Sequence, residues 1–160
     1  MKKLLLMLFV MVTCGAYAQT IQTNGTIYKE HPYITIVNHS NDLFVAQDWD
    51  NLAKLYADTV KFYDPSSIKK FGLDSAKKGW VGLASRWEKI TVVKEGYPDG
   101  LQYDKDPFTV QSWWVVTAVN KKTQKSAKFY LVQFDTFNKD GKIDTEVTYY
   151  DTSSLIAASK

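Results

Sequence analysis

Asp64 offers the clearest chemistry in this chain of 160 residues. It ends a run in which Val60, Phe62 and Asp64 fall on alternate positions, the spacing of a β-strand, and it directly precedes Pro65. A carboxylate that an apolar strand carries into a pocket is suited to abstract a proton. Asp64 also begins the turn sequence Asp-Pro-Ser-Ser, where its side chain would accept backbone N–H bonds. The sequence leaves both interpretations open.

Other polar groups join this pocket if they share the inward face of their strands. Side chains two positions apart in a strand point to the same side, and a slip of one residue inverts the whole set. We place Gln133 and Tyr150 inward, and we extend the same register to the strand that contains Trp113. The predicted inward set is Trp113, Val115, Thr117, Phe129, Leu131, Gln133, Asp135, Glu146, Thr148 and Tyr150.

The opposite face of these strands is also apolar. An apolar patch on an exposed sheet face usually marks an interface. The sequence therefore predicts a homodimer formed through the outer face of the sheet. The residues of this predicted interface are Trp114, Tyr130, Val132 and Phe134, with Val116 beside them.

Metal, nucleotide and nucleophile sites are not indicated. His31 and His39 have no partner His or acid at helical metal-binding spacing. The segment around Gly141 resembles a calcium loop only faintly, because Thr136 and Val147 stand where acidic ligands are needed. No glycine-rich phosphate loop and no nucleophile elbow is present. We predict neither a metal nor a cofactor.

Three helices followed by long strands must position these residues. The first helix is expected from Pro32 to about Gln47, a second over Asn51–Tyr56, and a third from Asp74 or Ser75 to about Lys89. The strands expected after the third helix are Ile90–Val93, Phe108–Asn120, Ser126–Phe137 and Ile143–Tyr150, with loops over 65–73 and after Lys94 and a hairpin turn at 138–141. Helices followed by an antiparallel meander indicate an α+β fold.

Two motifs carry a resemblance to a known family. They are "YADTVKFYDP" (Tyr56–Pro65) and "FNKDGKIDTEVTYYD" (Phe137–Asp151), with a tryptophan-bearing helix between them. In this order they resemble the SnoaL-like, nuclear-transport-factor-2-like superfamily, which includes SnoaL-type cyclases, ketosteroid isomerases and scytalone dehydratase. The resemblance covers most of residues 32–151. It implies an α+β fold with a cone-shaped, curved antiparallel sheet wrapped around three N-terminal helices, and a pocket inside the cone.

The resemblance also bears on the site. Asp64 falls where ketosteroid isomerase has its catalytic base. Ser40 and Gln133 fall where that enzyme has the tyrosine and the protonated aspartic acid of its oxyanion hole. Neither residue matches, so steroid isomerisation is not expected, and the pair of histidines of a scytalone dehydratase is missing.

Three functional hypotheses follow. The first is binding of a small apolar or aromatic molecule in an aromatic-lined pocket. The second is a cofactor-free isomerase, dehydratase or cyclase with Asp64 as general base, and the third is a structural dimer module with a filled core. The candidate ligand-binding residues are Ser40, Tyr63, Trp80, Trp87, Trp113, Leu131, Gln133, Asp135, Thr148 and Tyr150.

The first 18 residues have the pattern of a secretory signal peptide. Lys2 and Lys3 precede the apolar run Leu4–Val12, and a small-x-small cleavage site ends at Ala18. Cleavage there predicts an exported protein, periplasmic or secreted. The alternative is a lipoprotein anchored at Cys14, although Thr13 departs from the usual lipobox.

Removal of this segment changes the charge of the chain. It carries two of the 20 basic residues, which leaves 18 against 17 acidic residues and a net charge of about +1. Such a surface predicts no nucleic-acid partner, and no stable membrane association unless Cys14 is lipidated. We expect a loosely ordered lead-in over residues 19–31 and a single domain over 32–160.

Overall fold

The computed structural model describes residues 23–64 and 69–160. The predicted signal peptide and the Pro65–Ile68 part of the predicted loop lie outside these residues. Within them, no helix is long and apolar enough to cross a membrane.

Helix α2 (Pro32–Ala46) begins where the sequence predicts the first helix. Pro32 occupies the first helical turn, where its missing N–H costs nothing. His31 is the N-cap: its Nδ1 accepts a hydrogen bond from the backbone N–H of Tyr33 at 3.2 Å, and its ring stacks on Phe108 with centroids 3.9 Å apart. This histidine therefore has a structural role at the helix start.

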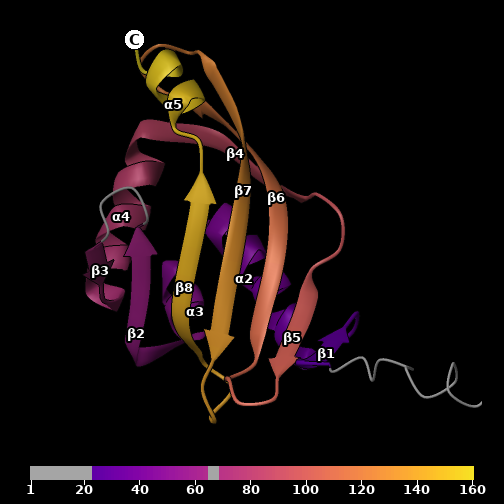
Figure 1. Ribbon diagram of the computed structural model, residues 1–160. Coiled ribbons are helices and arrows are strands. Elements are labelled where there is room, and N and C mark those ends of the chain that lie inside the picture. The colour runs from indigo at the N-terminus through magenta and orange to yellow at the C-terminus, as the bar shows by residue number, and fades with distance from the viewer. Residues whose placement is uncertain (1–22, 65–68) are drawn as a thin grey trace, which may run out of the picture.

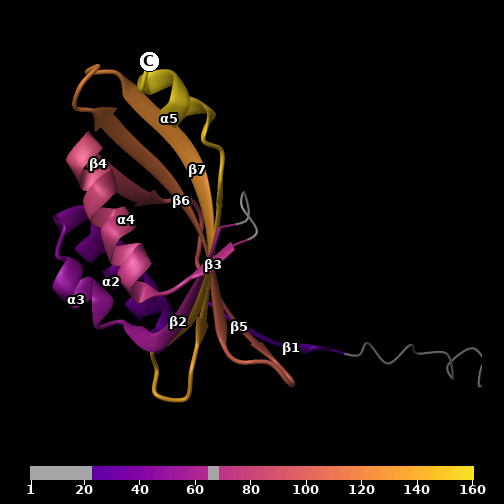
Figure 2. The ribbon, with the colours of Figure 1, turned by 90° about the vertical axis from the view of Figure 1, so that its left-hand side faces the viewer.

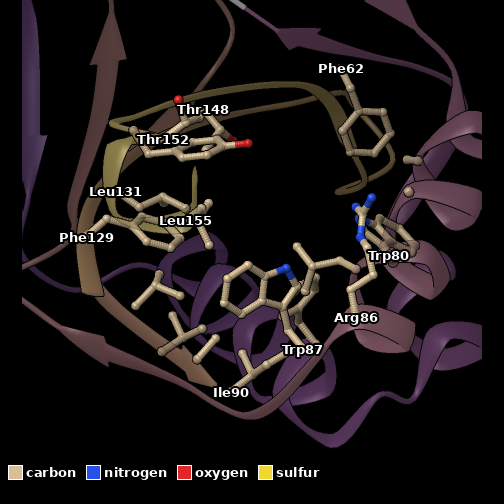
Figure 3. Close-up of a pocket in the computed structure, with 18 of the residues that line it drawn as sticks. Phe62, Trp80, Arg86, Trp87, Ile90, Phe129, Leu131, Thr148, Thr152 and Leu155 are labelled. Atoms are coloured by element: carbon tan, nitrogen blue, oxygen red, sulfur yellow. The ribbon is translucent and has the colours of Figure 1, made fainter. Parts of the chain in front are cut away.

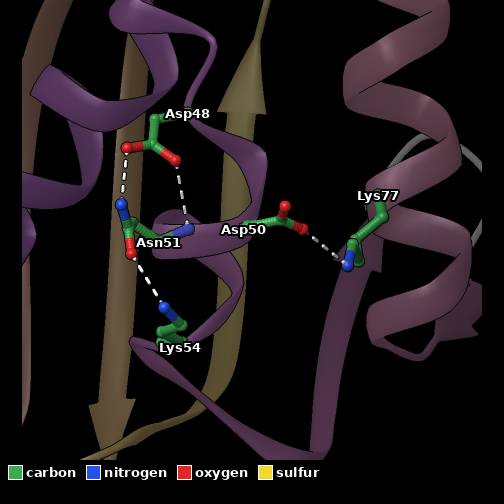
Figure 4. Close-up of polar contacts among 5 residues, drawn as sticks. All are labelled: Asp48, Asp50, Asn51, Lys54 and Lys77. Carbon is green, nitrogen blue, oxygen red and sulfur yellow. Dashed lines mark hydrogen bonds and ion pairs between the residues drawn. The ribbon is translucent and has the colours of Figure 1, made fainter.

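Helix α3 (Trp49–Ala53) is held by a chain of polar contacts (Figure 4). Asp48 caps it, accepting from the Asn51 backbone N–H at 3.3 Å and from Asn51 Nδ2 at 2.6 Å. Lys54 Nζ donates to Asn51 Oδ1 at 3.0 Å. An ion pair of 3.6 Å between Lys77 and Asp50 then ties α3 to helix α4 (Leu73–Arg86).

Helix α4 is the third predicted helix, but it ends three residues earlier than expected. Trp87 has extended backbone angles (φ −122°, ψ 146°) and begins a strand. A short fourth helix, α5 (Ser153–Ala158), follows the last strand and was not predicted.

Within residues 23–64 and 69–160, eight strands form one sheet in the order β1-β5-β6-β7-β8-β2-β3, and β4 pairs with β6 beside this path. Their bounds are β1 (Gly25–Tyr28), β2 (Tyr56–Asp64), β3 (Lys69–Phe71), β4 (Trp87–Lys94), β5 (Asp99–Tyr103), β6 (Thr109–Asn120), β7 (Ser126–Phe137) and β8 (Ile143–Tyr150). The predicted meander β6–β7–β8 is confirmed. The sheet is nevertheless mixed, because β2 lies parallel to β8.

The sheet curves around α2, α3 and α4, which all lie on one of its faces (Figures 1 and 2). The other face carries no helix in this view, and α5 sits at one end of the sheet (Figure 2). This arrangement confirms the predicted α+β fold with a curved sheet around three N-terminal helices. Strands β1, β3 and β5 fall in segments predicted as lead-in or loop.

The register of β6 corrects one prediction. Burial alternates along the strand, with Trp114, Val116 and Ala118 buried and Trp113 half-buried on the opposite face. Trp114 pairs with Leu131, and directly paired residues share a face of the sheet. The predicted inward set Trp113, Val115 and Thr117 is therefore wrong, and Trp114 and Val116 cannot contribute to an outer interface.

Candidate functional site

A cavity of about 1300 Å³ lies between the helices and the inner face of the sheet (Figure 3). Helices α2, α4 and α5 and strands β2, β4, β6, β7 and β8 all contribute side chains to its walls. Most of the walls are rings and aliphatic groups, which bury ligand surface without demanding hydrogen bonds. The apolar and aromatic lining includes Phe44, Tyr56, Phe62, Trp80, Trp87, Ile90, Phe129, Leu131 and Tyr150.

Two carboxyl groups, Asp135 and Glu146, lie opposite each other on paired strands, and Glu146 lines this cavity. Glu146 lines the cavity and is half-buried; its Oε2 accepts from the Tyr56 hydroxyl at 2.6 Å and its Oε1 from the Thr148 hydroxyl at 3.3 Å. Asp135 is fully buried, and its Oδ1 accepts from Gln133 Nε2 at 3.1 Å. Its Oδ2 has no hydrogen-bond partner among the described residues.

These surroundings raise the pKa of both acids. Burial raises the pKa of Asp135 well above its ordinary value, and the neighbouring Glu146 charge raises it further. Burial also raises the pKa of Glu146, while the bonds from Tyr56 and Thr148 work in the opposite direction. Because Glu146 has two hydroxyl donors and Asp135 only one amide donor, Asp135 is the better holder of a proton shared by the pair.

Tyr56 completes this cluster as a neutral donor. Burial, followed by the nearby Glu146 and Asp135 charges, raises the pKa of its phenol well above the ordinary value. The hydroxyl therefore keeps its proton and donates it in the short bond to Glu146. The arrangement can present a carboxyl group to a bound molecule as either a proton donor or a proton acceptor.

Sequence comparisons give no assignment: no family model matches the chain, and no curated protein matches it. Solved structures do match. IdmH of Streptomyces antibioticus, described as a candidate polyketide cyclase, has a TM-score of 0.66 and 13% identity over 80% of this chain and 98% of that one. A nuclear-transport-factor-2-like protein of Burkholderia thailandensis has a TM-score of 0.65 and 15% identity over 82% of this chain and 99% of that one.

A third match is a protein of Catenulispora acidiphila with a ketosteroid isomerase-like fold, in complex with trimethylamine. Its TM-score is 0.61, with 16% identity over 78% of this chain and 91% of that one. The chain has the SnoaL-like, nuclear-transport-factor-2-like fold. At these identities the likeness carries the fold, and the function has to be argued from the residues of the site.

Eight of the predicted ligand-binding residues line the cavity. They are Ser40, Tyr63, Trp80, Trp87, Leu131, Gln133, Thr148 and Tyr150. Asp135 does not line the cavity itself, but it is hydrogen-bonded to Gln133, which does. Trp113 is on the outer face of the sheet. The Ser40 hydroxyl donates a hydrogen bond to the Val37 carbonyl oxygen at 2.8 Å, so toward a ligand it can act only as an acceptor.

The predicted base, Asp64, is the last residue of β2, and its backbone pairs with Lys69. Its side chain lies outside the described residues, so its role as a base stays a prediction. Among the residues that the structure does describe, no group of three His, Cys, Asp or Glu side chains could hold a metal ion.

Several site residues are missing from the predicted ligand-binding set. Glu146 was predicted on the inward face with Thr148 and Tyr150, and the structure places it there, but the sequence did not indicate its role as a site carboxyl group. Tyr56 and Phe62 belong to the buried face of β2. Arg86 ends a helix, and nothing in its spacing indicates that it reaches a cavity.

Proposed function

We propose that this SnoaL-like domain binds a small, largely apolar molecule in its cavity. The observation that carries the proposal is the cavity itself, at about 1300 Å³ with walls made mostly of rings. Ligand pockets commonly have volumes of roughly 300–1,000 Å³, whereas a filled core has few voids larger than a water molecule. The size and composition of the cavity therefore favour ligand binding over a structural module with a filled core.

Similar structures support the same proposal. The Catenulispora acidiphila protein has this fold and is in complex with a small molecule, trimethylamine. IdmH is described as a candidate polyketide cyclase.

Binding can be tested with a neutral fluorescent probe, N-phenyl-1-naphthylamine. Leu131 lines the cavity, and its neighbour Val132 faces the other side of β7. We expect saturable binding that Leu131→Ala weakens about tenfold, because burying each methylene contributes about 0.8 kcal/mol. Val132→Ala is the matched control and should leave the affinity unchanged. Absence of saturable binding by the wild type would refute the proposal.

A second candidate function is acid–base catalysis without a cofactor. The observation that favours it is Glu146, a cavity-lining carboxyl group with a raised pKa and a fixed tyrosine donor. Such a group can transfer a proton in isomerisation, dehydration or cyclisation. Asp64 remains our candidate for a second proton-transfer group.

Turnover of compounds that bind would test this candidate. Glu146→Gln keeps the shape of the side chain and should abolish turnover while binding is retained. Asp64→Asn should do the same if Asp64 is the base. Unchanged turnover in both variants would contradict acid–base catalysis by these residues.

We also propose that the domain forms a homodimer through the outer face of the sheet. Tyr130 is 64% exposed and Tyr149 51% exposed on this face, beside the half-buried side chains of Trp113, Val132 and Phe134. The strand register places Trp113, Val132 and Tyr149 in one row across β6, β7 and β8. A continuous apolar patch of this kind is typical of an interface.

Export is the last part of this proposal. It rests on the charged start, apolar run and small-x-small site of residues 1–18. The mass of the protein recovered from outside the cytoplasm tests it. A chain beginning at Gln19 would support cleavage after Ala18, whereas a lipid-modified chain beginning at Cys14 would overturn it in favour of an anchored form.

A further inference from the structure

We infer that the ligand of this cavity is an organic anion whose acidic group binds at Arg86 and Trp87 while its apolar body lies among the rings. This inference rests on the proposed binding function and names its ligand class. The two residues are adjacent where α4 ends and β4 begins, and both line the cavity.

Trp87 contributes a donor that no group of the described residues uses. The side chain is only 5% exposed, and its indole N–H makes no hydrogen bond within the described residues. Figure 3 shows the indole nitrogen on the side of the ring that faces the cavity. A donor in this position is open to an acceptor that enters the cavity.

Arg86 contributes a charged donor next to it. Its guanidinium makes no ion pair or hydrogen bond within the described residues, and Figure 3 shows it extending to the cavity. The group presents five N–H donors in a planar fork that fits a carboxylate or a similar oxyanion. Two neighbouring residues thus bring one charged and one neutral donor to the same cavity.

The plain structural explanation for Arg86 is that a cation stabilises the carboxyl-terminal end of α4. Lys121 already fills this place: its Nζ donates to the Ala84 carbonyl oxygen at 2.7 Å. The backbone N–H of Lys121 also donates to the Arg86 carbonyl oxygen at 2.9 Å. Lys121 therefore provides the hydrogen bonds to the carbonyl oxygens of the last turn, and the Arg86 side chain remains available to a ligand.

The charge balance of the cavity points to an anion as well. Besides Arg86, its described lining contains Lys121, Lys122 and Lys160, whereas Glu146 is the one acidic side chain in that lining. Glu146 lies on β8 and has a raised pKa. A cleft lined mainly by one sign of charge raises the local concentration of ligands of opposite sign.

The ligand class that fits is a small amphipathic acid, with one carboxylate or sulfonate group on an aromatic or aliphatic body. A pair of probes isolates the acidic group. 1-Anilinonaphthalene-8-sulfonate and N-phenyl-1-naphthylamine share the same ring system, and only the first carries an anionic group. Both are measured by fluorescence titration at low salt, where charge interactions are least screened.

We expect the anionic probe to bind the wild type at least tenfold more tightly than the neutral probe. Arg86→Gln should weaken the anionic probe about tenfold, which is about 1.4 kcal/mol, and leave the neutral probe unchanged. Trp87→Phe keeps a ring and removes the N–H, so it should weaken the anionic probe about threefold. Lys78→Gln, which removes an exposed charge of α4 that does not line the cavity, is the matched control.

Two outcomes overturn the inference, and they are distinguishable. If the neutral probe binds and Arg86→Gln leaves the anionic probe unaffected, the anion site is refuted while the proposed binding function stands. If neither probe binds the wild type, both the proposed function and this inference fail. If Arg86→Gln folds poorly, Arg86→Lys keeps the charge without the planar fork, and we expect it to bind the anionic probe more weakly than the wild type and the neutral probe equally well.

Discussion

Replacing Asp135 with Asn tests the electrostatics of the buried acid pair. Asp135 is fully buried, and its Oδ2 has no hydrogen-bond partner among the described residues. Asn has the same shape as protonated Asp, so its Oδ1 can still accept from Gln133 while its amide group supplies a donor in place of Oδ2. The substitution therefore removes a titration and an unsatisfied acceptor together.

The sign of the effect follows from the raised pKa of Asp135. Above its ordinary pKa, the unfolded chain gives up this proton while the folded protein still holds it, so stability falls as the pH rises. Each unit by which the folded pKa exceeds the unfolded one costs about 1.4 kcal/mol once Asp135 is ionised. Asp135→Asn escapes this cost, and its advantage over the wild type should grow from pH 4 to pH 8.

The unsatisfied acceptor sets the scale of the gain. Leaving a buried acceptor without a partner costs about 1–3 kcal/mol. In a domain of this size a change of 1 kcal/mol moves the melting temperature by roughly 4 °C. We expect Asp135→Asn to melt roughly 4–12 °C above the wild type at pH 8 and within about 2 °C of it at pH 4.

Thermal melts of residues 19–160 followed by circular dichroism between pH 4 and pH 8 provide the assay. Asp58→Asn, at an exposed position of β2, controls for a general effect of losing one carboxylate. A variant that melts below the wild type at pH 8, or that keeps the wild-type dependence on pH, would refute the reasoning about the pair.

Three further predictions concern packing and assembly. In urea titrations, Trp114→Ala should lower the free energy of unfolding by about 3–5 kcal/mol and Trp113→Ala by less than about 1.5 kcal/mol, because only Trp114 is buried. The reverse order would contradict the register of β6. Gly100→Ala should cost about 1–3 kcal/mol because an added Cβ would lie 2.6 Å from a ring carbon, whereas Gly82→Ala in α4, with nothing within 4 Å, should gain about 0.5–1 kcal/mol. Tyr130→Glu should halve the mass measured by light scattering, since it puts a charge on the proposed dimer face; an unchanged mass would exclude this interface.

The sequence predicted the elements whose periodicity is strong and local. Helix α2 and strands β7 and β8 lie where the spacing of apolar residues places them. Strands β1 and β3 are short and largely exposed, and β5 lies between turn-rich segments. Such strands are created by pairing with residues far away in the chain, so no pattern within their own few residues predicts them.

The site was predictable where the two faces of a strand differ in polarity. In β7 and β8, Gln133 and Thr148 mark one face, and the sequence analysis placed that face inward, as the structure does. In β6 both faces carry large apolar groups, Trp113 on one and Trp114 on the other, so alternation alone could not select the buried one. The link between Tyr56 and Glu146 joins residues 90 positions apart and depends on the whole topology.

The parallel pairing of β2 with β8 has a consequence for how the molecule is made. Strand β2 is synthesised early, yet the strand that lies beside it is the last of the sheet, and contacts between such distant segments form slowly because a long loop must close first. Until Ile143–Tyr150 has emerged from the ribosome, β2 and β7 each have an unpaired edge, and exposed edges invite association between chains. The hydrogen bond between Tyr56 and Glu146 can form only at that final step. A nascent chain that stalls before β8 thus has neither a completed sheet nor its acidic site, and we expect it to depend on protection from aggregation during this interval.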